Sequence, residues 1–167
     1  GSARGELPSA EERAALPADL ISVAHGTNCW TRTPVSADLF GAGLQAFLDL
    51  VRAGHPETPI IAISPILRLD AEDTPNVLGM SLADLRTVFE NVVEERREKG
   101  DEHLRLVPGR DLVPEAHLPD GIHPDDAGHR RMAEVLGPLL GEVVRARAPQ
   151  VRMLRRHTSV ATGQKVI

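Results

Sequence analysis

Short apolar runs and longer stretches with helical spacing alternate along the chain. The short runs lie at 19–24, 59–65 and 103–107, and each has a proline or glycine close to both ends. Runs of this length and bracketing predict β-strands. The first two are mostly continuous, as in strands buried on both faces, whereas the third alternates, as expected for a strand nearer a sheet edge.

Three longer segments repeat apolar residues every three or four positions, which predicts helices with one buried face. The first segment follows Ser36, a residue type that favours the N-cap. The second follows Ser81, and Asp84 stands three residues further on, as in a capping box. The third begins near Asp125 or Asp126.

Helices of this length between successive strands allow the crossovers of a parallel sheet with helices on both faces, so the predicted fold class is α/β. With 167 residues, of which 41% are hydrophobic and 26% charged, the chain suits one globular domain. We place this domain at residues 1–147. Residues 148–167 are expected to form a basic, flexible tail, and Gly137-Pro138 to kink or break the last helix.

The composition narrows the classes of partner. Aromatic residues make up 2% of the chain and the formal net charge is -5, which disfavours nucleic acid. No apolar run approaches the roughly 20 residues that cross a bilayer, and no signal peptide is found in the chain as given, so we expect a soluble protein. The chain has a single cysteine, Cys29, which excludes an internal disulfide and fits a cytoplasmic location. A targeting signal in a segment before residue 1 would change the expected location.

Residues with side chains that can take part in catalysis follow the first and third predicted strands. In a parallel sheet these positions lie outside the carboxyl ends of the strands, where ligands bind. Asp120 and His123 stand three apart across a glycine. The carboxylate can accept the Nδ1 proton and leave Nε2 free as a general base toward a serine hydroxyl. The same spacing also suits a capped helix start with a surface histidine.

Three residues after the first strand are further candidates. Asn28 can donate to a developing oxyanion or serve as an ordinary turn residue. Trp30 can line one side of a pocket for an acyl group or a sugar, or it can pack against other residues at the carboxyl end of the sheet. Cys29 is either a small buried residue or a reactive thiol.

The sequence HGTN at 25–28, followed by DGIHPDDAGH at 120–129, resembles the third and fifth blocks of the SGNH (GDSL-like) hydrolase family. The opening GSARGE at 1–6 is similar to the second block of that family. This resemblance extends to about residue 144. It implies a flavodoxin-like, three-layer α/β/α fold and a serine-dependent esterase, acylhydrolase or acyltransferase that works through an acyl-enzyme without a cofactor.

The resemblance also implies a role for each matching residue. Gly1 and Asn28 supply the oxyanion donors, His123 is the base, and Asp120 orients it. The family's nucleophilic serine stands on a turn after its first strand, and no such turn occurs in this sequence. We therefore expect the nucleophile upstream of residue 1, together with the first strand or strands of the fold, and residues 1–167 alone to be inactive.

Two other interpretations remain open. Asp120, His123, Asp125 and His129 have the residue types of a zinc or manganese site. A non-catalytic α/β interaction module also fits a chain without the nucleophile. Under the leading interpretation the partner is a small-molecule ester or acyl substrate. The sequence does not determine the acyl and alcohol groups of this substrate, whether the acyl group is hydrolysed or transferred, or the oligomeric state of the protein.

Overall fold

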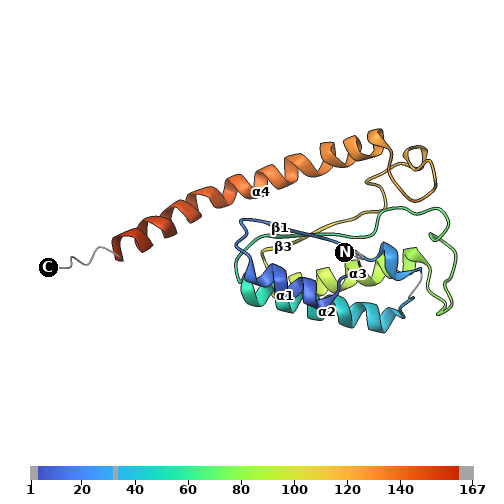
Figure 1. Ribbon diagram of the computed structural model, residues 1–167, viewed down its shortest axis with the longest axis horizontal. Helices are drawn as coiled ribbons and strands as arrows, with labels where there is room; N and C mark the ends of the chain where they lie inside the picture. Colours follow the sequence, from blue (N-terminus) through green and yellow to red (C-terminus); the bar gives the residue numbers. More distant parts are fainter. Residues whose placement is uncertain (1–3, 32–33, 162–167) are drawn as a thin grey trace.

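The computed structural model describes residues 4–31 and 34–161, with side chains described as far as Ala146. Three short strands form one parallel sheet in the order β1-β2-β3, and helices separate them along the chain (Figure 1). This arrangement confirms the predicted α/β class. The elements are α1 (Leu7–Ala15), β1 (Ile21–Ala24), η1 (Thr27–Cys29), α2 (Ala37–Gly54), β2 (Ile60–Ile63), α3 (Leu82–Glu98), β3 (Leu104–Val107), η2 (Glu115–His117) and α4 (Asp126–Ala161).

The central strand β2 is buried along its whole length, as its continuous apolar run predicts. Its first residue, Ile60, pairs with Ile21 on one side and Leu104 on the other. β3 lies at an edge of the sheet, which agrees with its alternating pattern. β1 differs from the prediction of a buried strand, because Ser22 and Ala24 are exposed.

Helices cover the two faces of the sheet unequally. α1, α2 and α3 lie on one face, and α4 crosses the other (Figure 1). The first face holds the larger core, which includes Phe47 and Phe89. On the second face, Val143 of α4 packs with Ile61 and Val107 of β2 and β3. α4 therefore covers β2 and β3 and leaves the outward-facing residues of β1 exposed.

Polar caps confirm the predicted helix starts. Ser36 Oγ accepts a hydrogen bond from the third residue of α2 at 3.3 Å. Ser81 and Asp84 form a complete capping box, with bonds of 3.1 and 2.9 Å. Asp125 Oδ1 accepts from the N–H of Gly128 at 2.7 Å in the first turn of α4. Caps of this kind typically contribute about 1 kcal/mol each.

The sequence analysis did not anticipate α1, whose one buried residue is Ala10. This helix is held against α2 by backbone contacts rather than by a broad apolar face. The backbone of Gly54 lies so near the Ala14 carbonyl that an added Cβ would clash. Beside it, the Nε2–H of His55 donates to the carbonyl of Arg13 at 2.8 Å.

The last helix, α4, continues to Ala161. It runs through Gly137 and Pro138 without the predicted break, because apolar residues on both sides, such as Met132 and Val143, pack against the sheet. The helical backbone passes the predicted domain boundary, so the division into domain and tail stays a prediction. Within the described part of the chain, no helix has the length and apolarity to cross a bilayer.

Candidate active site

The turn after η2 brings Asp120 and His123 together. The Nδ1–H of His123 donates to Asp120 Oδ2 at 2.7 Å. The other carboxylate oxygen accepts from the backbone N–H groups of Ile122 and His123 at 2.9 and 2.7 Å. Gly121, between them, has a φ of 77°, which a residue without Cβ adopts readily. The carboxylate therefore fixes both the turn and the imidazole.

The hydrogen bonds at Asp120 favour its ionised carboxylate form. The bond from the His123 side chain, followed by the two backbone bonds, holds the pKa of the Asp120 carboxyl well below its usual 3.8. A carboxylate only accepts hydrogen bonds, so Nδ1 carries a proton, and in the neutral imidazole Nε2 therefore presents a lone pair. The His123 side chain is 78% exposed, so Nε2 is accessible. This is the arrangement of a general base.

Asn28 lies in η1, directly after β1, and is exposed. Gly26 enters this turn with a φ of 119°, and an added Cβ would lie 2.9 Å from side-chain atoms of both Phe40 and Pro65. Glycine therefore allows the chain to turn away from the core at this point. The turn places Asn28 at the carboxyl end of the sheet, the same end as the loop after β3.

Trp30 joins η1 to the loop after β2. Its Nε1–H donates to the carbonyl of Thr74 at 2.7 Å, and the guanidinium carbon of Arg68 lies 5.2 Å from its ring centroid. Arg68 also bonds both carboxylate oxygens of Asp70 at 2.7 and 2.9 Å. These contacts pack Trp30 on the rim, and its role as a pocket wall stays a prediction. Sequence reasoning missed Arg68 and Asp70, because no local motif links them to Trp30.

A backbone hydrogen bond joins the loop after β2 to the Asp120–His123 turn. The N–H of Leu69 donates to the carbonyl of Gly121 at 2.8 Å. The Leu69 side chain lies over this glycine, since an added Cβ on Gly121 would be 3.4 Å from Leu69 Cβ. The loops after all three strands are thus connected at one end of the sheet.

The predicted oxyanion donor Gly1 lies outside the described residues, so its role stays a prediction. The described serines do not stand on a nucleophile turn. Ser64 is buried, donates to Glu90 at 2.7 Å and accepts from the N–H of Gly109 at 2.8 Å. Ser22 is an exposed residue of β1. The serines that make hydrogen bonds near helix starts are Ser9, Ser36 and Ser81.

The structure does not bring the residues of the alternative metal site together. In the parts of the chain that are described, no three His, Cys, Asp or Glu side chains gather as metal ligands. Asp125 instead caps α4 and lies 3.5 Å from Nδ1 of His117. Capping directs this carboxylate into the first turn of α4, which explains why the set does not form. The four residues of that set are Asp120, His123, Asp125 and His129.

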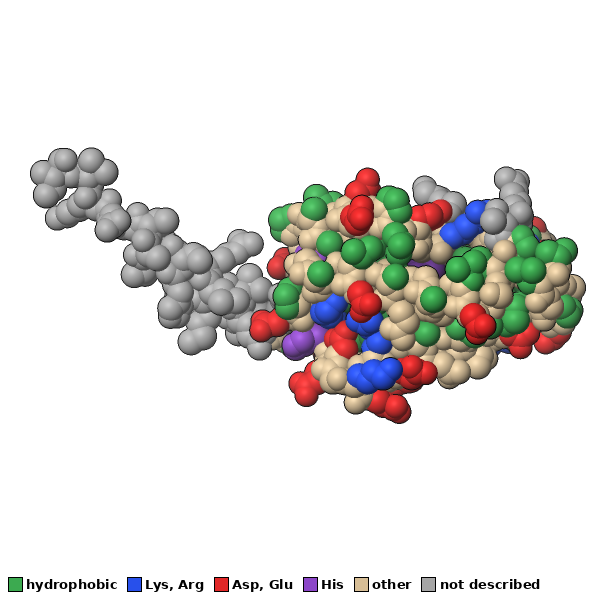
Figure 2. All heavy atoms as spheres, turned by 90° about the horizontal axis from the view of Figure 1, so that it is seen from below, with side chains coloured by type: hydrophobic (Ala, Val, Ile, Leu, Met, Phe, Trp, Pro, Cys, Tyr) green, Lys and Arg blue, Asp and Glu red, His purple; other side chains and the backbone are tan. Residues whose placement is uncertain are grey.

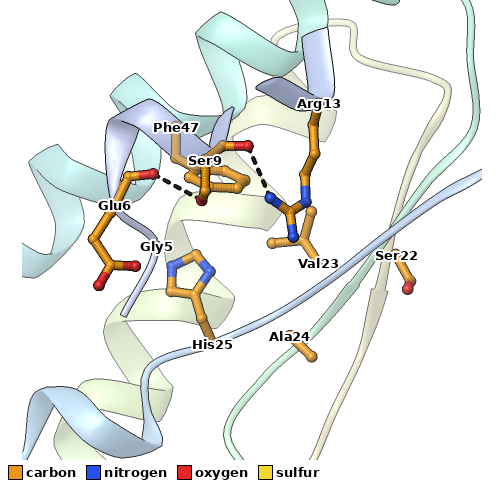
Figure 3. A pocket seen from close by; sticks show the side chains of 9 residues that line it. All are labelled: Gly5, Glu6, Ser9, Arg13, Ser22, Val23, Ala24, His25 and Phe47. Atoms are coloured by element: carbon orange, nitrogen blue, oxygen red, sulfur yellow. Dashed lines mark hydrogen bonds between the residues drawn. The ribbon is translucent and has the colours of Figure 1, made fainter. Parts of the chain in front are cut away.

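A hollow of about 390 Å³ is lined by α1, by the residues just before it and by β1 (Figure 3). His25 points from the end of β1 toward Gly5 and Glu6 at this hollow (Figure 3). The buried ring contacts three phenylalanines, and its burial lowers the pKa of His25 to about 4. The imidazole is therefore neutral at physiological pH and belongs to the core.

Cys29 has no features of a reactive thiol. Its side chain is buried, and this burial raises the pKa of the Cys29 thiol to about 11. Because the thiolate is the nucleophilic form, the thiol is inert at neutral pH. Of the two roles considered for Cys29, the structure supports the small buried residue.

The surface beside α1, α2 and α3 mixes acidic and basic side chains with apolar ones (Figure 2). The ion pairs on these helices bring opposite charges together, as in Arg96 with Asp49 at 2.6 Å. Surface pairs of this kind contribute little to stability, typically about 0–1 kcal/mol. The carboxyl rim, rather than this face, therefore carries the candidate chemistry.

An α/β sheet with an aspartate-oriented histidine on its carboxyl rim is typical of hydrolases of the SGNH class. Residues 2–131 match the GDSL-like lipase/acylhydrolase family, and the chain belongs to that family. The predicted family is thereby confirmed. No match was found among curated proteins.

Solved structures agree with this assignment. The salicylyl-acyltransferase from a tetracycline biosynthetic pathway is 29% identical, with a TM-score of 0.66 over 79% of this chain and 40% of that one. A structure described as a GDSL-like lipase from Bacteroides ovatus is 22% identical, with a TM-score of 0.67 over 85% of this chain and 41% of that one. A peptidoglycan O-acetylesterase is 19% identical, with a TM-score of 0.63 over 83% of this chain and 41% of that one. The last two show the shared fold alone, and the chain spans about two fifths of the length of all three.

Proposed function

We propose that this chain carries the base and an oxyanion donor of a serine-dependent ester hydrolase or acyltransferase. The observation that carries the proposal is the 2.7 Å hydrogen bond from His123 Nδ1–H to Asp120. This bond fixes the tautomer that presents Nε2 as a base, and the 78% exposure of the His123 side chain keeps Nε2 accessible.

In the proposed reaction, Nε2 of His123 takes the proton of a serine hydroxyl as its oxygen attacks the ester carbonyl. Asp120 stabilises the imidazolium that forms, and the side-chain amide of Asn28 donates to the oxyanion. The imidazolium then protonates the leaving alcohol, which gives an acyl-enzyme. Water or a second alcohol, deprotonated by the same Nε2, attacks that acyl group and releases the serine.

We propose that the serine comes from chain preceding residue 1. The serines whose side chains are described lie in first turns or caps of helices, in the core or on the exposed face of β1, as set out above. In addition, β1 pairs with β2 alone among the described residues, and it lines the hollow beside His25. A further parallel strand on the other edge of β1 would end at the same rim, so a serine on the turn after it would lie near η1.

The family and the neighbouring structures support a proposal for the substrate class. The neighbours include a salicylyl-acyltransferase and a peptidoglycan O-acetylesterase. We propose an ester of a small molecule or a carbohydrate for this chain as well. The fold alone does not distinguish these acyl groups.

Covalent labelling with a fluorophosphonate probe tests the proposal. The chain 1–167 should remain unlabelled, and the same chain with its native upstream segment should be labelled on one upstream serine, located by mass spectrometry. A Ser22→Ala variant of the extended chain is the matched control and should label normally. Stoichiometric labelling of any serine within residues 1–167 would contradict the upstream nucleophile.

A further inference from the structure

The loop after β2 holds a buried arginine to which the proposed reaction assigns no role. The Arg68 side chain is 8% exposed, a degree of burial that arginine rarely shows unless it is paired. Asp70 binds its Nε and Nη2 with two bonds of 2.7 and 2.9 Å. The ring of Trp30 lies against the guanidinium at 5.2 Å. We call Trp30, Arg68 and Asp70 the arginine clamp.

The arginine clamp encloses the segment that is hydrogen-bonded to the Asp120–His123 turn. Leu69 stands between Arg68 and Asp70, so the residues on both sides of it are joined by the paired side chains. Its N–H donates to the carbonyl of Gly121 at 2.8 Å. Gly121 in turn is the residue about which the carboxylate of Asp120 folds back to reach His123.

We propose that Arg68 is a positioning residue for the Asp120–His123 pair, an inference that rests on the proposed function. Arg68 holds Leu69 in place, and the Leu69 bond to Gly121 keeps the turn closed. The pair needs such support because its side chains are 54% and 78% exposed, so water competes for their hydrogen bond. Arg68 itself contacts no reacting atom.

The same clamp links the two halves of the candidate site. Trp30 follows Asn28 by two residues, and its indole N–H is anchored to the Thr74 carbonyl in the loop after β2. The clamp therefore sets the spacing between η1, which carries the oxyanion donor, and the turn that carries the base. A site of this kind works only when both groups are held within about 0.5 Å of their productive positions.

The tautomer of His123 tests this role without requiring turnover. Imidazole ¹⁵N chemical shifts, measured by NMR at about pH 9 where histidines are neutral, distinguish Nδ1–H from Nε2–H. The wild-type chain should hold His123 as Nδ1–H. Arg68→Met should lose about half or more of that tautomer, and Arg68→Lys, which keeps the charge but not the paired bonds, should lie between the two.

Arg52→Met is the matched control. Arg52 is also a poorly exposed arginine with two bonds to one carboxylate, that of Asp101, but it binds carbonyls at the opposite end of the sheet, before β2. This variant should lower the thermal midpoint and leave the His123 tautomer unchanged. An equal tautomer change in Arg52→Met would overturn the proposal, because the effect would then be general destabilisation.

The outcomes separate the two proposals. Nε2–H in the wild-type chain would contradict the proposed function itself. Nδ1–H in both the wild type and Arg68→Met would leave the proposed function standing and overturn the role of Arg68. If Arg68→Met does not fold by circular dichroism, Arg68→Lys decides, and an unchanged tautomer there overturns the role.

Discussion

Replacing His25 with leucine should remove a large part of the pH dependence of folding stability. The His25 residue is 9% exposed, and its ring centroid lies 6.2, 5.3 and 5.7 Å from those of Phe40, Phe47 and Phe89. These surroundings penalise the charged imidazolium, and burial lowers the pKa of His25 from 6.5 to about 4, against a weaker opposing effect of Glu6. Protonation therefore opposes folding.

The direction and the size follow from proton binding in the two states. The unfolded chain binds a proton at His25 below its ordinary pKa of 6.5, and the folded chain only below about 4. The free energy of unfolding is therefore unaffected above the upper value and falls as the pH drops between the two. The difference between the two pKa values lowers the free energy of unfolding by about 3 kcal/mol at pH 4. This is a large share of the roughly 5–15 kcal/mol that stabilises a typical domain.

Urea unfolding followed by circular dichroism at several pH values between about 4 and 7 measures this effect. The wild-type chain should lose about 3 kcal/mol more than His25→Leu over that range. His103→Gln, a change at an exposed histidine, should keep the wild-type pH dependence. Parallel losses in the wild type and His25→Leu would refute the reasoning.

Two further substitutions address the loop after β1. In the extended chain, Asn28→Ala should lower kcat by about 10²–10³ with little change in KM, because the amide acts only as charge develops; a raised KM with an intact kcat would indicate ground-state binding instead. Gly26→Ala should destabilise the fold by about 2 kcal/mol or more in thermal unfolding, since its φ is 119° and the new Cβ would meet Phe40 and Pro65. Gly43→Ala, in the middle of α2 with open space around it, should be neutral or stabilising.

Much of the fold follows from local pattern. The apolar runs predict all three strands, and the serine caps place α2 and α3 within a residue of their observed starts. These patterns depend only on residues that are close in the sequence, so they can be recognised without knowledge of the tertiary structure. The Asp120–His123 hydrogen bond is equally local, because three residues and one glycine suffice to close it.

What the sequence did not reveal depends on contacts between distant segments. Nothing in the sequence around His25 shows that its ring is buried, because the phenylalanines that surround it come from α2 and α3. The burial of β1 was overestimated, since the position of α4 over the other two strands cannot be read from the strand itself. The contact of Arg68 with Trp30 likewise joins two loops that only the folded sheet brings together.

Ester turnover by the extended chain with and without His123 tests the central claim most directly. With a short-chain p-nitrophenyl ester, His123→Ala should lower kcat/KM by about 10³-fold or more, since the serine would lose its base. The same substitution at the exposed His103 is the control and should leave turnover unchanged, and neither variant should shift the thermal midpoint by more than a few degrees. Turnover of the ester by a folded His123→Ala variant at the wild-type rate would contradict the role of the Asp120–His123 pair.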